Sequence, residues 1–463
     1  MVKGQSKMFI ISKELELQRH PTSNNSLQIS STKPIIVRAI NSKDRSIQTS
    51  LLKASDKLGT LYKIPPIPSN IAEQLLSPSD IPERAPFTVI VINTGAENTV
   101  QWKGGDYQKV SLTPFKLVQF WMSNVDAAYE VEASEPVSVL FGHPCATIFN
   151  CTCGMLLTPL DPVINTKLNF FIPPDFTTDG KDEAVLLVAD KDRPLLYDPD
   201  HPRVKSVGSV VFHRPGLLLS IIPEEDFAAC FLINEDLSYN NNILHSKSYA
   251  VVVVHKDHKD LVHYRSEPLS SPDWKDIKTT NYVSTSVKLL YRKNVFWHPK
   301  AMMAVYLMGS TKTQLFGNPA PIISKHTNLK GCVIIPEVVV MGDALMDWQE
   351  SIQYCREQDM ELASMNGPKL RHLAPKIHAK NKTVKEVWIG FRRSSLTGNW
   401  YWLSPEDKGV ETHWAKGEPG ESEEGQCAMM SLDPDKDFGW SDESCCTAAV
   451  PLCYKFPILF PLW

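Results

Sequence analysis

Short apolar runs between turn residues recur along most of the chain, and they limit its fold more than any other feature. From about residue 29 to 315 they include FTVIVINTG, AVLLVAD, LLLSIIP, YAVVVVH and MAVYLMG. β-Branched and aromatic residues fit a pleated strand, and the Gly, Pro, Asn and Asp residues between the runs favour turns. Helical periodicity is scarce in this region. The pattern predicts a mostly β region built as a sandwich, a barrel or a propeller.

Some of these runs recur at offsets of about 100 residues, as the units of an internal repeat do. TKPIIVRAIN (from Thr32) is similar to SEPVSVLFGH (from Ser134), and KIPPIP (from Lys63) is similar to FFIPPDF (from Phe170). This recurrence predicts a repeated β-sandwich or a propeller-like region. Any two β regions share patterns of this kind, so chance similarity stays open as the alternative.

Length and charge limit the number of domains and the kinds of partner. A chain of 463 residues predicts two to four domains. A formal net charge of -4 gives no reason to expect nucleic acid or an anionic membrane surface as a partner. No run reaches the roughly 18 apolar residues of a membrane span, and the closing FPILFPLW is short and carries two prolines.

Cysteines and glycosylation sequons favour an extracellular setting. Of the 10 cysteines, five lie between Cys355 and Cys453 and three within residues 145–153. Asn-x-Ser/Thr sequons occur at Asn24, Asn150 and Asn381. Together these features predict a secreted protein with disulfide bonds. The first residues, MVKGQSKMFIISKELELQRH, contain no signal-peptide core, so we interpret residues 1–28 as a disordered or incomplete segment.

The segment YEVEASEPVSVLFGHPCATIFNCTCGMLLTPLDPVINTKLNFFIPP carries a VSVLFGH turn, a following pair of cysteines, a strand start and a PP exit. It resembles the N-terminal domain of the IgGFc-binding protein family. We take residues 29–318 as a β-rich region of this kind. The resemblance implies a bridge between Cys145 and Cys153, with Cys151 additional. Cys230 and Cys332 have no assigned partner.

Two groups of residues in this region could instead bind metal. CATIFNCTC with His143 could form a cluster, but zinc sites usually need a second Cys/His pair in register, so a disulfide knot is favoured. His255, His258 and His263 follow a strand and alternate with Lys and Asp, which indicates a solvated hairpin tip. The region contains no nucleophile elbow, phosphate loop or zinc-protease motif, so we predict no enzymatic activity.

A stretch rich in helix and strand breakers, FGNPAPIISKHTNLKG, separates this region from the rest, and we predict a linker over residues 319–333. Beyond it, Asp347 can cap a helix whose third position is Glu350, a capping-box arrangement. A second helix is predicted at GPKLRHLAPKIH, where Pro368 suits a first turn. The runs VWIGF, NWYWLS, CAMMSL and AVPLCY then predict strands, and together these elements indicate an α+β domain.

The C-terminal motifs DWQESIQYCREQDMELASM, VWIGF, HWAKGEPGE, GWSDESC and VPLCY stand in the order of a C-type lectin-like domain. Residues 334–456 resemble this family, leaving residues 457–463 as a tail. The resemblance implies disulfides between Cys355 and Cys453 and between Cys427 and Cys445. Cys446 is then surplus: it pairs elsewhere, cross-links two chains into an oligomer, or stays free.

Acidic residues near these motifs raise the question of calcium. Asp433, Asp435 and Asp437 have the first spacing of an EF-hand loop, but Phe438 stands where that loop needs glycine and Ser444 where it needs glutamate. These residues are therefore interpreted as an ordinary loop between strands.

Sugar-binding members of the lectin family hold calcium through the residues of an EPN motif, a glutamate before the third motif and the residues of a WND motif. Glu418 and Asp442 match this set, whereas Gly420 and Ser441 replace asparagines. A loop shift of Glu421, Glu423 or Glu424 can compensate. The resemblance thus implies Glu418, Glu424, Ser441 and Asp442 as calcium and ligand residues, and a cis bond before Pro419. The alternative is a solvated acidic loop, because calcium needs six to eight oxygens. Trp388, Trp400, Trp402 and Trp440 are expected in the core.

These features predict a secreted, non-catalytic recognition protein that binds a glycan or a glycoprotein surface, in mucosal or innate defence by analogy with the two families. The alternative is a structural or adhesive mucus component whose lectin-like domain makes calcium-independent protein contacts.

Overall fold

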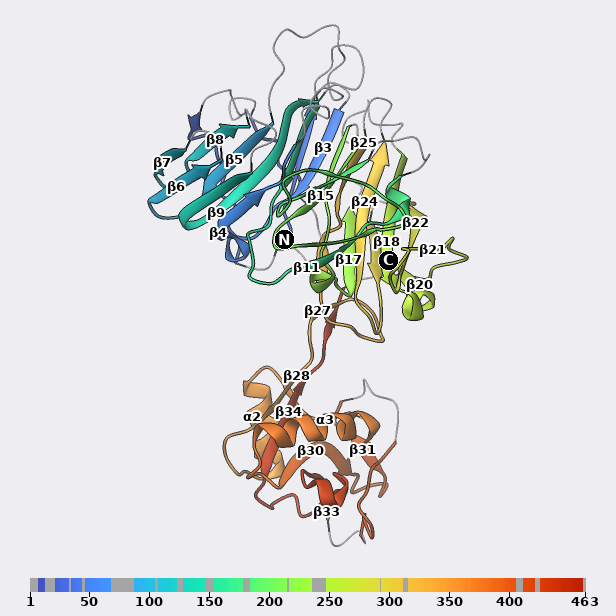
Figure 1. Ribbon diagram of the computed structural model, residues 1–463. Coiled ribbons are helices and arrows are strands. Elements are labelled where there is room, and N and C mark those ends of the chain that lie inside the picture. Colours follow the sequence, from blue (N-terminus) through green and yellow to red (C-terminus); the bar gives the residue numbers. More distant parts are fainter. Residues whose placement is uncertain are drawn as a thin grey trace, which may run out of the picture. The chain divides into compact units, whose positions relative to one another are not determined.

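The fold is mostly β, as the sequence predicts, and the chain divides into two compact units (Figure 1). Unit 1 comprises residues 1–333 with 460–463, and unit 2 comprises residues 334–459. The structure is a computed structural model. It describes residues 7–12, 21–32, 35–43, 46–67, 87–104, 107–122, 128–146, 154–177, 184–214, 216–234, 247–291, 293–310, 315–365, 367–404, 411–420 and 425–460.

The first sheet of unit 1 is antiparallel, and its strands do not follow sequence order. One long strand, β9, lies at its centre. Its 8 strands are β1 (Thr22–Ser23), β4 (Gly59–Ile64), β5 (Thr88–Asn93), β6 (Asn98–Lys103), β7 (Gln108–Leu112), β8 (Leu117–Trp121), β9 (Tyr129–Ala146) and β10 (Gly154–Pro159). The main path runs β1-β8-β5-β9-β6-β7, with β4 and β10 also paired to β9. The hydrophobic face of this sheet carries stacked rings, including Trp102 on Phe120 with centroids 4.9 Å apart.

In two further sheets of unit 1 the central strands are buried on both faces. The first contains β12 (Val185–Val188), β13 (Leu195–Leu196), β15 (Val210–Arg214) and β16 (Leu217–Ser220). In β12, Leu187 packs into the core shared with the first sheet, whereas Leu186 packs into the next core. Because successive side chains point to opposite faces, a strand between two cores needs apolar residues at every position. This explains the unbroken run AVLLVAD.

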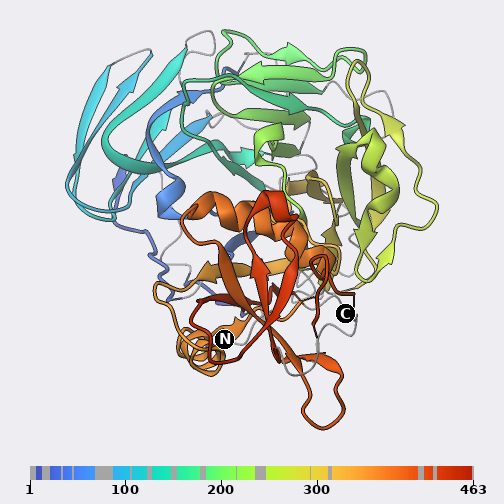
Figure 2. The ribbon, with the colours of Figure 1, turned by 90° about the horizontal axis from the view of Figure 1, so that it is seen from below.

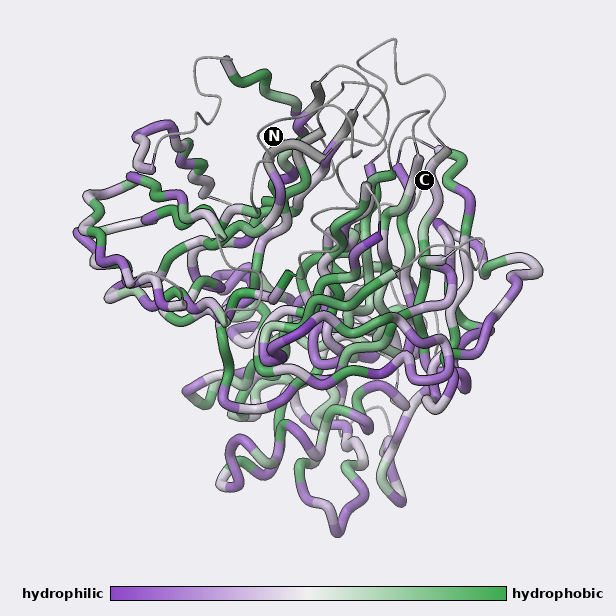
Figure 3. Tube along the Cα trace, turned by 45° about the horizontal axis from the view of Figure 1, so that its top comes forward, coloured by the Kyte–Doolittle hydropathy of each residue, from purple (hydrophilic) through white to green (hydrophobic). Residues whose placement is uncertain are grey.

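The second buried sheet follows the same rule. It contains β18 (Lys247–His255), β21 (Lys275–Asp276), β22 (Tyr282–Lys288), β24 (Met303–Ser310) and β25 (Leu315–Pro319). In β18, Val251 and Val253 face one core, while Val252 and Val254 face the other. Figure 3 shows hydrophobic residues following the interiors of such strands, with hydrophilic residues gathered at the turns.

A further sheet closes the third core of unit 1. Its strands are β17 (Cys230–Asn234), β19 (His263–Tyr264), β20 (Glu267–Pro268), β23 (Lys293–Trp297) and β26 (Ile322–Ser324). Smaller pairs are β2 (Arg38–Lys43) with β3 (Ser46–Leu51), and β11 (Leu168–Phe171) with β14 (Arg203–Ser206). A disulfide joins Cys230 to Cys332 across 102 residues of sequence and so supplies the two partners that the sequence left unassigned.

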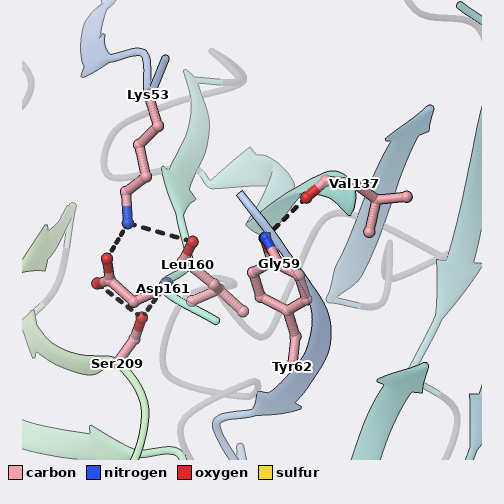
Figure 4. A network of polar contacts seen from close by, with 7 residues as sticks. All are labelled: Lys53, Gly59, Tyr62, Val137, Leu160, Asp161 and Ser209. Atoms are coloured by element: carbon pink, nitrogen blue, oxygen red, sulfur yellow. Dashed lines mark hydrogen bonds and ion pairs between the residues drawn. The ribbon is translucent and has the colours of Figure 1, made fainter. Parts of the chain in front are cut away.

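Polar contacts tie the start of unit 1 to its middle sheet (Figure 4). The ammonium group of Lys53 forms an ion pair with Asp161, and the Ser209 hydroxyl donates to the same carboxylate over 3.2 Å. Nearby, the Tyr62 hydroxyl donates to the Val137 carbonyl over 2.7 Å. Burial raises the pKa of Tyr62 to about 12, so this hydroxyl stays protonated and remains a donor.

A propeller is not what the described residues show. A propeller blade pairs consecutive strands, whereas here β8 lies beside β5 and β5 beside β9, so distant segments are interleaved. The structure shows stacked sheets instead. Within the expected linker 319–333, residues 322–324 form β26 and pair with β17, because a short edge strand tolerates a breaker-rich sequence. In the expected tail, Ile458–Leu459 forms β35 and pairs with β27 (Val333–Ile335).

Unit 2 is an α+β domain with a sheet of 7 strands and two α-helices. Its strands are β28 (Val338–Met341), β29 (Glu361–Leu362), β30 (Glu386–Arg393), β31 (Trp400–Trp402), β32 (Cys427–Ser431), β33 (Trp440–Glu443) and β34 (Val450–Lys455). The helices are α2 (Trp348–Glu357) and α3 (Gly367–Lys380), which flank the orange-to-red strands in Figures 1 and 2.

Local sequence signals explain both helices. Asp347 accepts a hydrogen bond from the Glu350 backbone N–H, and the Glu350 side chain accepts one from the Asp347 N–H, which completes the predicted capping box. One face of α2 then buries Trp348, Ile352 and Cys355. Disulfides join Cys355 to Cys453 and Cys427 to Cys445, the two bridges that the family resemblance implies. The first bridge joins α2 to β34, and the second joins the start of β32 to the segment that follows β33.

Candidate functional site

Of the candidate calcium residues, Glu418, Ser441 and Asp442 are described, and they lie where a loop meets β33. The peptide bond between Glu418 and Pro419 is cis. The following Gly420 N–H donates a hydrogen bond of 2.7 Å to Asp442 Oδ1. Glycine at 425 lets the returning chain approach β33 closely, because a Cβ there would lie 2.5 Å from the Glu443 nitrogen. Both described ends of the loop thus lie against β33, Gly420 through a hydrogen bond to the Asp442 side chain and Gly425 through a close backbone approach.

Glu418 and Asp442 are brought together at this junction. The side chain of Asp442 beside it, and then burial, raise the pKa of the Glu418 carboxyl, because two neighbouring carboxylates resist ionising together. Asp442 is only 8% exposed, and its Oδ2 has no hydrogen-bond partner among the described residues. A buried carboxylate oxygen without a partner is costly, so Asp442 Oδ2 is an unused acceptor at this junction.

Ser441 is not part of this pair. Along β33, Trp440 and Asp442 are buried while Ser441 and Glu443 are partly exposed, as expected when side chains alternate between faces. The Ser441 side chain therefore lies on the face of β33 opposite to that of Asp442. Burial, and then the charges of Glu386 and Asp442, raise the pKa of Glu443. The residue that replaces the second asparagine of the family motif therefore points away from Glu418.

The residues that the structure describes do not complete a calcium site. Glu424, the fourth predicted residue, lies outside the described residues. Within the described ranges no group of three or more His, Cys, Asp or Glu side chains is placed to hold a metal ion. Glu418 and Asp442 supply two carboxylates, whereas calcium takes about six to eight oxygens. The orphaned Asp442 oxygen suits a cation, but the described donor set is too small for one.

The three aspartates that resemble an EF-hand start do not converge on one point. Asp433 caps a short 3₁₀ turn (Pro434–Lys436) by accepting a hydrogen bond from the Asp435 N–H. Asp437 instead binds Arg371 on α3, with 2.8 Å between its Oδ1 and Nη2. The Asp433 carboxylate therefore caps a turn, and the Asp437 carboxylate forms an ion pair.

The histidines of unit 1 also lack a metal arrangement among the described residues. The segment Lys256–Leu261 forms an exposed 3₁₀ turn after β18, and His255 accepts from the Asp257 N–H at its start. His263 stacks on Trp297 with ring centroids 4.2 Å apart. The rings of His255 and His258 lie 5.9 Å apart, but no group of three metal-ligating side chains forms here among the described residues.

Several predicted modification and disulfide residues fall outside the described part. These are the side chain of Cys145 together with Asn150, Cys151 and Cys153. Among those that are described, Asn24 and Asn381 are exposed, as glycan acceptors must be. Cys446 is exposed and has no partner among the described cysteines, and it lies next to the bridged Cys445.

The tryptophans are core residues, as the sequence predicts. Trp388 and Trp440 are fully buried in two different cores, and Trp400 and Trp402 pack partly buried against the core that contains Trp440. Sequence motifs did not reveal Arg371 and His413, which Asp437 brings together on one face of unit 2. No local signal could have found them, because the three residues lie far apart along the chain.

Comparison with known proteins identifies unit 2. The family model "Lectin C-type domain" matches residues 344–455, so this part of the chain is a C-type lectin domain. The CD209 antigen of Nomascus concolor is 25% identical over 117 residues, which cover 25% of this chain and 27% of the relative. Human lithostathine, a solved structure, aligns with 18% identity and a TM-score of 0.24, covering 26% of this chain and 92% of that one.

Another part of the chain is distantly similar to a much longer protein. Human IgGFc-binding protein is 28% identical over 207 residues, which cover 42% of this chain but only 4% of the relative. The chain therefore spans less than a third of the length of either curated relative. In the described residues, no helix is long and apolar enough to cross a membrane.

Proposed function

We propose that this protein, whose residues 344–455 form a C-type lectin domain, is a secreted, non-catalytic recognition protein that binds a glycan or a protein surface. The lectin domain is the observation that carries the proposal. Disulfides in both units support an extracellular location, because such bonds persist in oxidising compartments. A role in mucosal or innate defence extends the proposal by analogy with the families that the two regions resemble.

A glycan array probed with the full chain, once with calcium and once with EDTA, tests this function. Selective binding to a defined set of glycans supports glycan recognition. If no glycan binds in either buffer, glycan recognition is rejected and recognition of a protein surface remains as the proposed function.

Calcium-dependent sugar binding is a second candidate, favoured by the orphaned Asp442 Oδ2 beside Glu418. These two residues would hold the ion, together with Glu424 as the family motif implies, whereas Ser441 lies on the other face of β33. Retention on mannose or galactose resin that EDTA abolishes, and that a Glu418→Ala/Asp442→Ala variant lacks, supports this candidate. Retention that persists in EDTA rejects it.

An adhesive role is a third candidate, favoured by the exposed, unpaired Cys446. In this role the lectin domain makes calcium-independent protein contacts, and Cys446 links chains into an oligomer. Non-reducing electrophoresis should then show multimers that disappear on reduction and in a Cys446→Ser variant. A purely monomeric wild type rejects it.

A further inference from the structure

An open pocket of about 510 Å³ lies in unit 2, between the first turn of α3 and the loop of residues 411–413. Arg371 and His372 line it from the helix, and Glu411, Thr412 and His413 line it from the loop. This volume is within the range of about 300–1,000 Å³ that holds small ligands. Glu418 and Asp442 do not line the pocket, so it is separate from the candidate calcium residues.

Backbone contacts fix the shape of the pocket. The Gly367 N–H donates to the Glu411 carbonyl over 2.8 Å, which holds the loop against the start of the helix. A Cβ at position 367 would lie 3.0 Å from that carbonyl oxygen, so glycine permits the close approach. At its other end the loop is joined to β33, because the Trp440 N–H donates to the His413 carbonyl over 2.9 Å. Trp440 is fully buried, so this end is anchored in the core.

Asp437 positions two of the side chains that line the pocket. Its Oδ1 accepts from Arg371 Nη2 over 2.8 Å, and its backbone oxygen lies 2.8 Å from His413 Nε2. Arg371 and His413 come from opposite walls, so one residue links the helix to the loop. Side chains that are held before a ligand arrives lose less entropy on binding.

The lining offers donors and acceptors side by side. Arg371 can only donate hydrogen bonds, the Glu411 carboxylate can only accept them, and the Thr412 hydroxyl can do both. Each hydroxyl of a sugar is likewise both donor and acceptor, and neighbouring hydroxyls present the two roles together. The carboxylates of Glu411 and Asp437 offset the charge of Arg371, so the pocket does not favour an anionic ligand.

We infer that this pocket binds a residue of a neutral saccharide without calcium. The inference rests on the proposed function in its glycan-binding form and names the place of binding. Thr412 and Glu411 are exposed, so their side chains are free to meet a ligand and their substitution should not disturb the core.

The test compares two variants of the full chain with wild type in EDTA. The first variant, Glu411→Gln/Thr412→Val, alters the pocket while keeping its shape and the Gly367–Glu411 backbone bond. The control, Glu418→Gln/Asp442→Asn, alters only the acidic pair. Methyl α-D-mannopyranoside, methyl β-D-galactopyranoside and N-acetyl-D-glucosamine serve as probes, with binding measured by saturation-transfer NMR and titration calorimetry.

We expect at least one probe to bind in EDTA, the pocket variant to bind it at least tenfold more weakly, and the control to bind like wild type. Binding that needs calcium, or that the control loses and the pocket variant keeps, overturns the inference and leaves the proposed glycan recognition intact. If no probe binds in EDTA the inference also fails. The proposed glycan recognition fails only if the array shows no binding with calcium as well.

Discussion

The two units of this protein bury their apolar side chains in different ways. Unit 1 stacks sheets so that its central strands face a core on each side, and it has a single described disulfide, Cys230–Cys332. Unit 2 is smaller, and its edge strand β28 buries one face and exposes the other. Two disulfides and a cluster of tryptophans hold it together. Small domains bury less surface for each residue, so covalent links carry more of their stability.

The largest expected effect tests whether unit 2 depends on its disulfides. A Cys355→Ala/Cys453→Ala variant opens a loop of 98 residues, which costs about 4.7 kcal/mol in the chain-entropy model. Opening the Cys427–Cys445 loop of 18 residues should cost about 3 kcal/mol. Differential scanning calorimetry should show the unit 2 transition moving down while the unit 1 transition stays in place. Equal shifts of both transition temperatures would contradict the prediction that these disulfides stabilise unit 2 alone.

Burial on two faces makes a contrasting prediction for unit 1. Leu186 and Leu187 point in opposite directions from β12, yet each is almost fully buried. Leu186→Ala and Leu187→Ala should therefore each lower the free energy of unfolding by about 2–5 kcal/mol. In unit 2, Val338→Ala on the exposed face of β28 should cost less than about 0.5 kcal/mol. Urea denaturation measures all three, and a small effect at either leucine would show that β12 has only one core.

Acid should weaken unit 1 through a buried histidine. Burial, and then the charge of His143, lower the pKa of His213 from 6.5 to about 4. The unfolded chain takes up this proton near pH 6.5, whereas the folded chain does not until about pH 4. The stability of unit 1 should thus fall between pH 6.5 and 4, by up to about 3 kcal/mol. A His213→Leu variant should lose this part of the pH dependence, and an unchanged profile would show that other groups cause it.

A smaller loss of stability is expected from removing a helix cap in unit 2. Asp347→Ala removes the capping box of α2 and should cost about 1 kcal/mol, because the Glu350 N–H loses its acceptor. Asp347→Asn keeps an acceptor and should retain most of the stability. The two variants are compared by thermal unfolding of unit 2, where equal losses would mean that charge rather than the cap matters.

Local features were readable from the sequence, and long-range ones were not. The capping box at Asp347 and the buried face of α2 depend on residues a few positions apart, so their pattern predicted them. The pairing of β8 with β5, and of Cys230 with Cys332, joins distant segments, and no local pattern specifies it. Apolar runs such as AVLLVAD indicated buried strands but did not say that the strands lie between two cores.

The candidate site shows the same limit. The family motif placed Ser441 and Asp442 together, yet side chains alternate along β33, so Ser441 lies on the opposite face from Asp442. The apolar Trp440 next to Ser441 in the sequence was the signal for this alternation. The hydrogen bond from the Gly420 N–H to Asp442 comes from the backbone, which a comparison of side chains cannot reveal.

The central claim is that recognition resides in unit 2, and glycan-array binding by the Cys355→Ala/Cys453→Ala variant tests it most directly. The variant is compared with wild type under conditions where calorimetry shows unit 1 folded and unit 2 unfolded. The account predicts that wild type binds a defined set of glycans and that the variant binds none of them. Undiminished binding by the variant would place recognition in unit 1 and contradict the account.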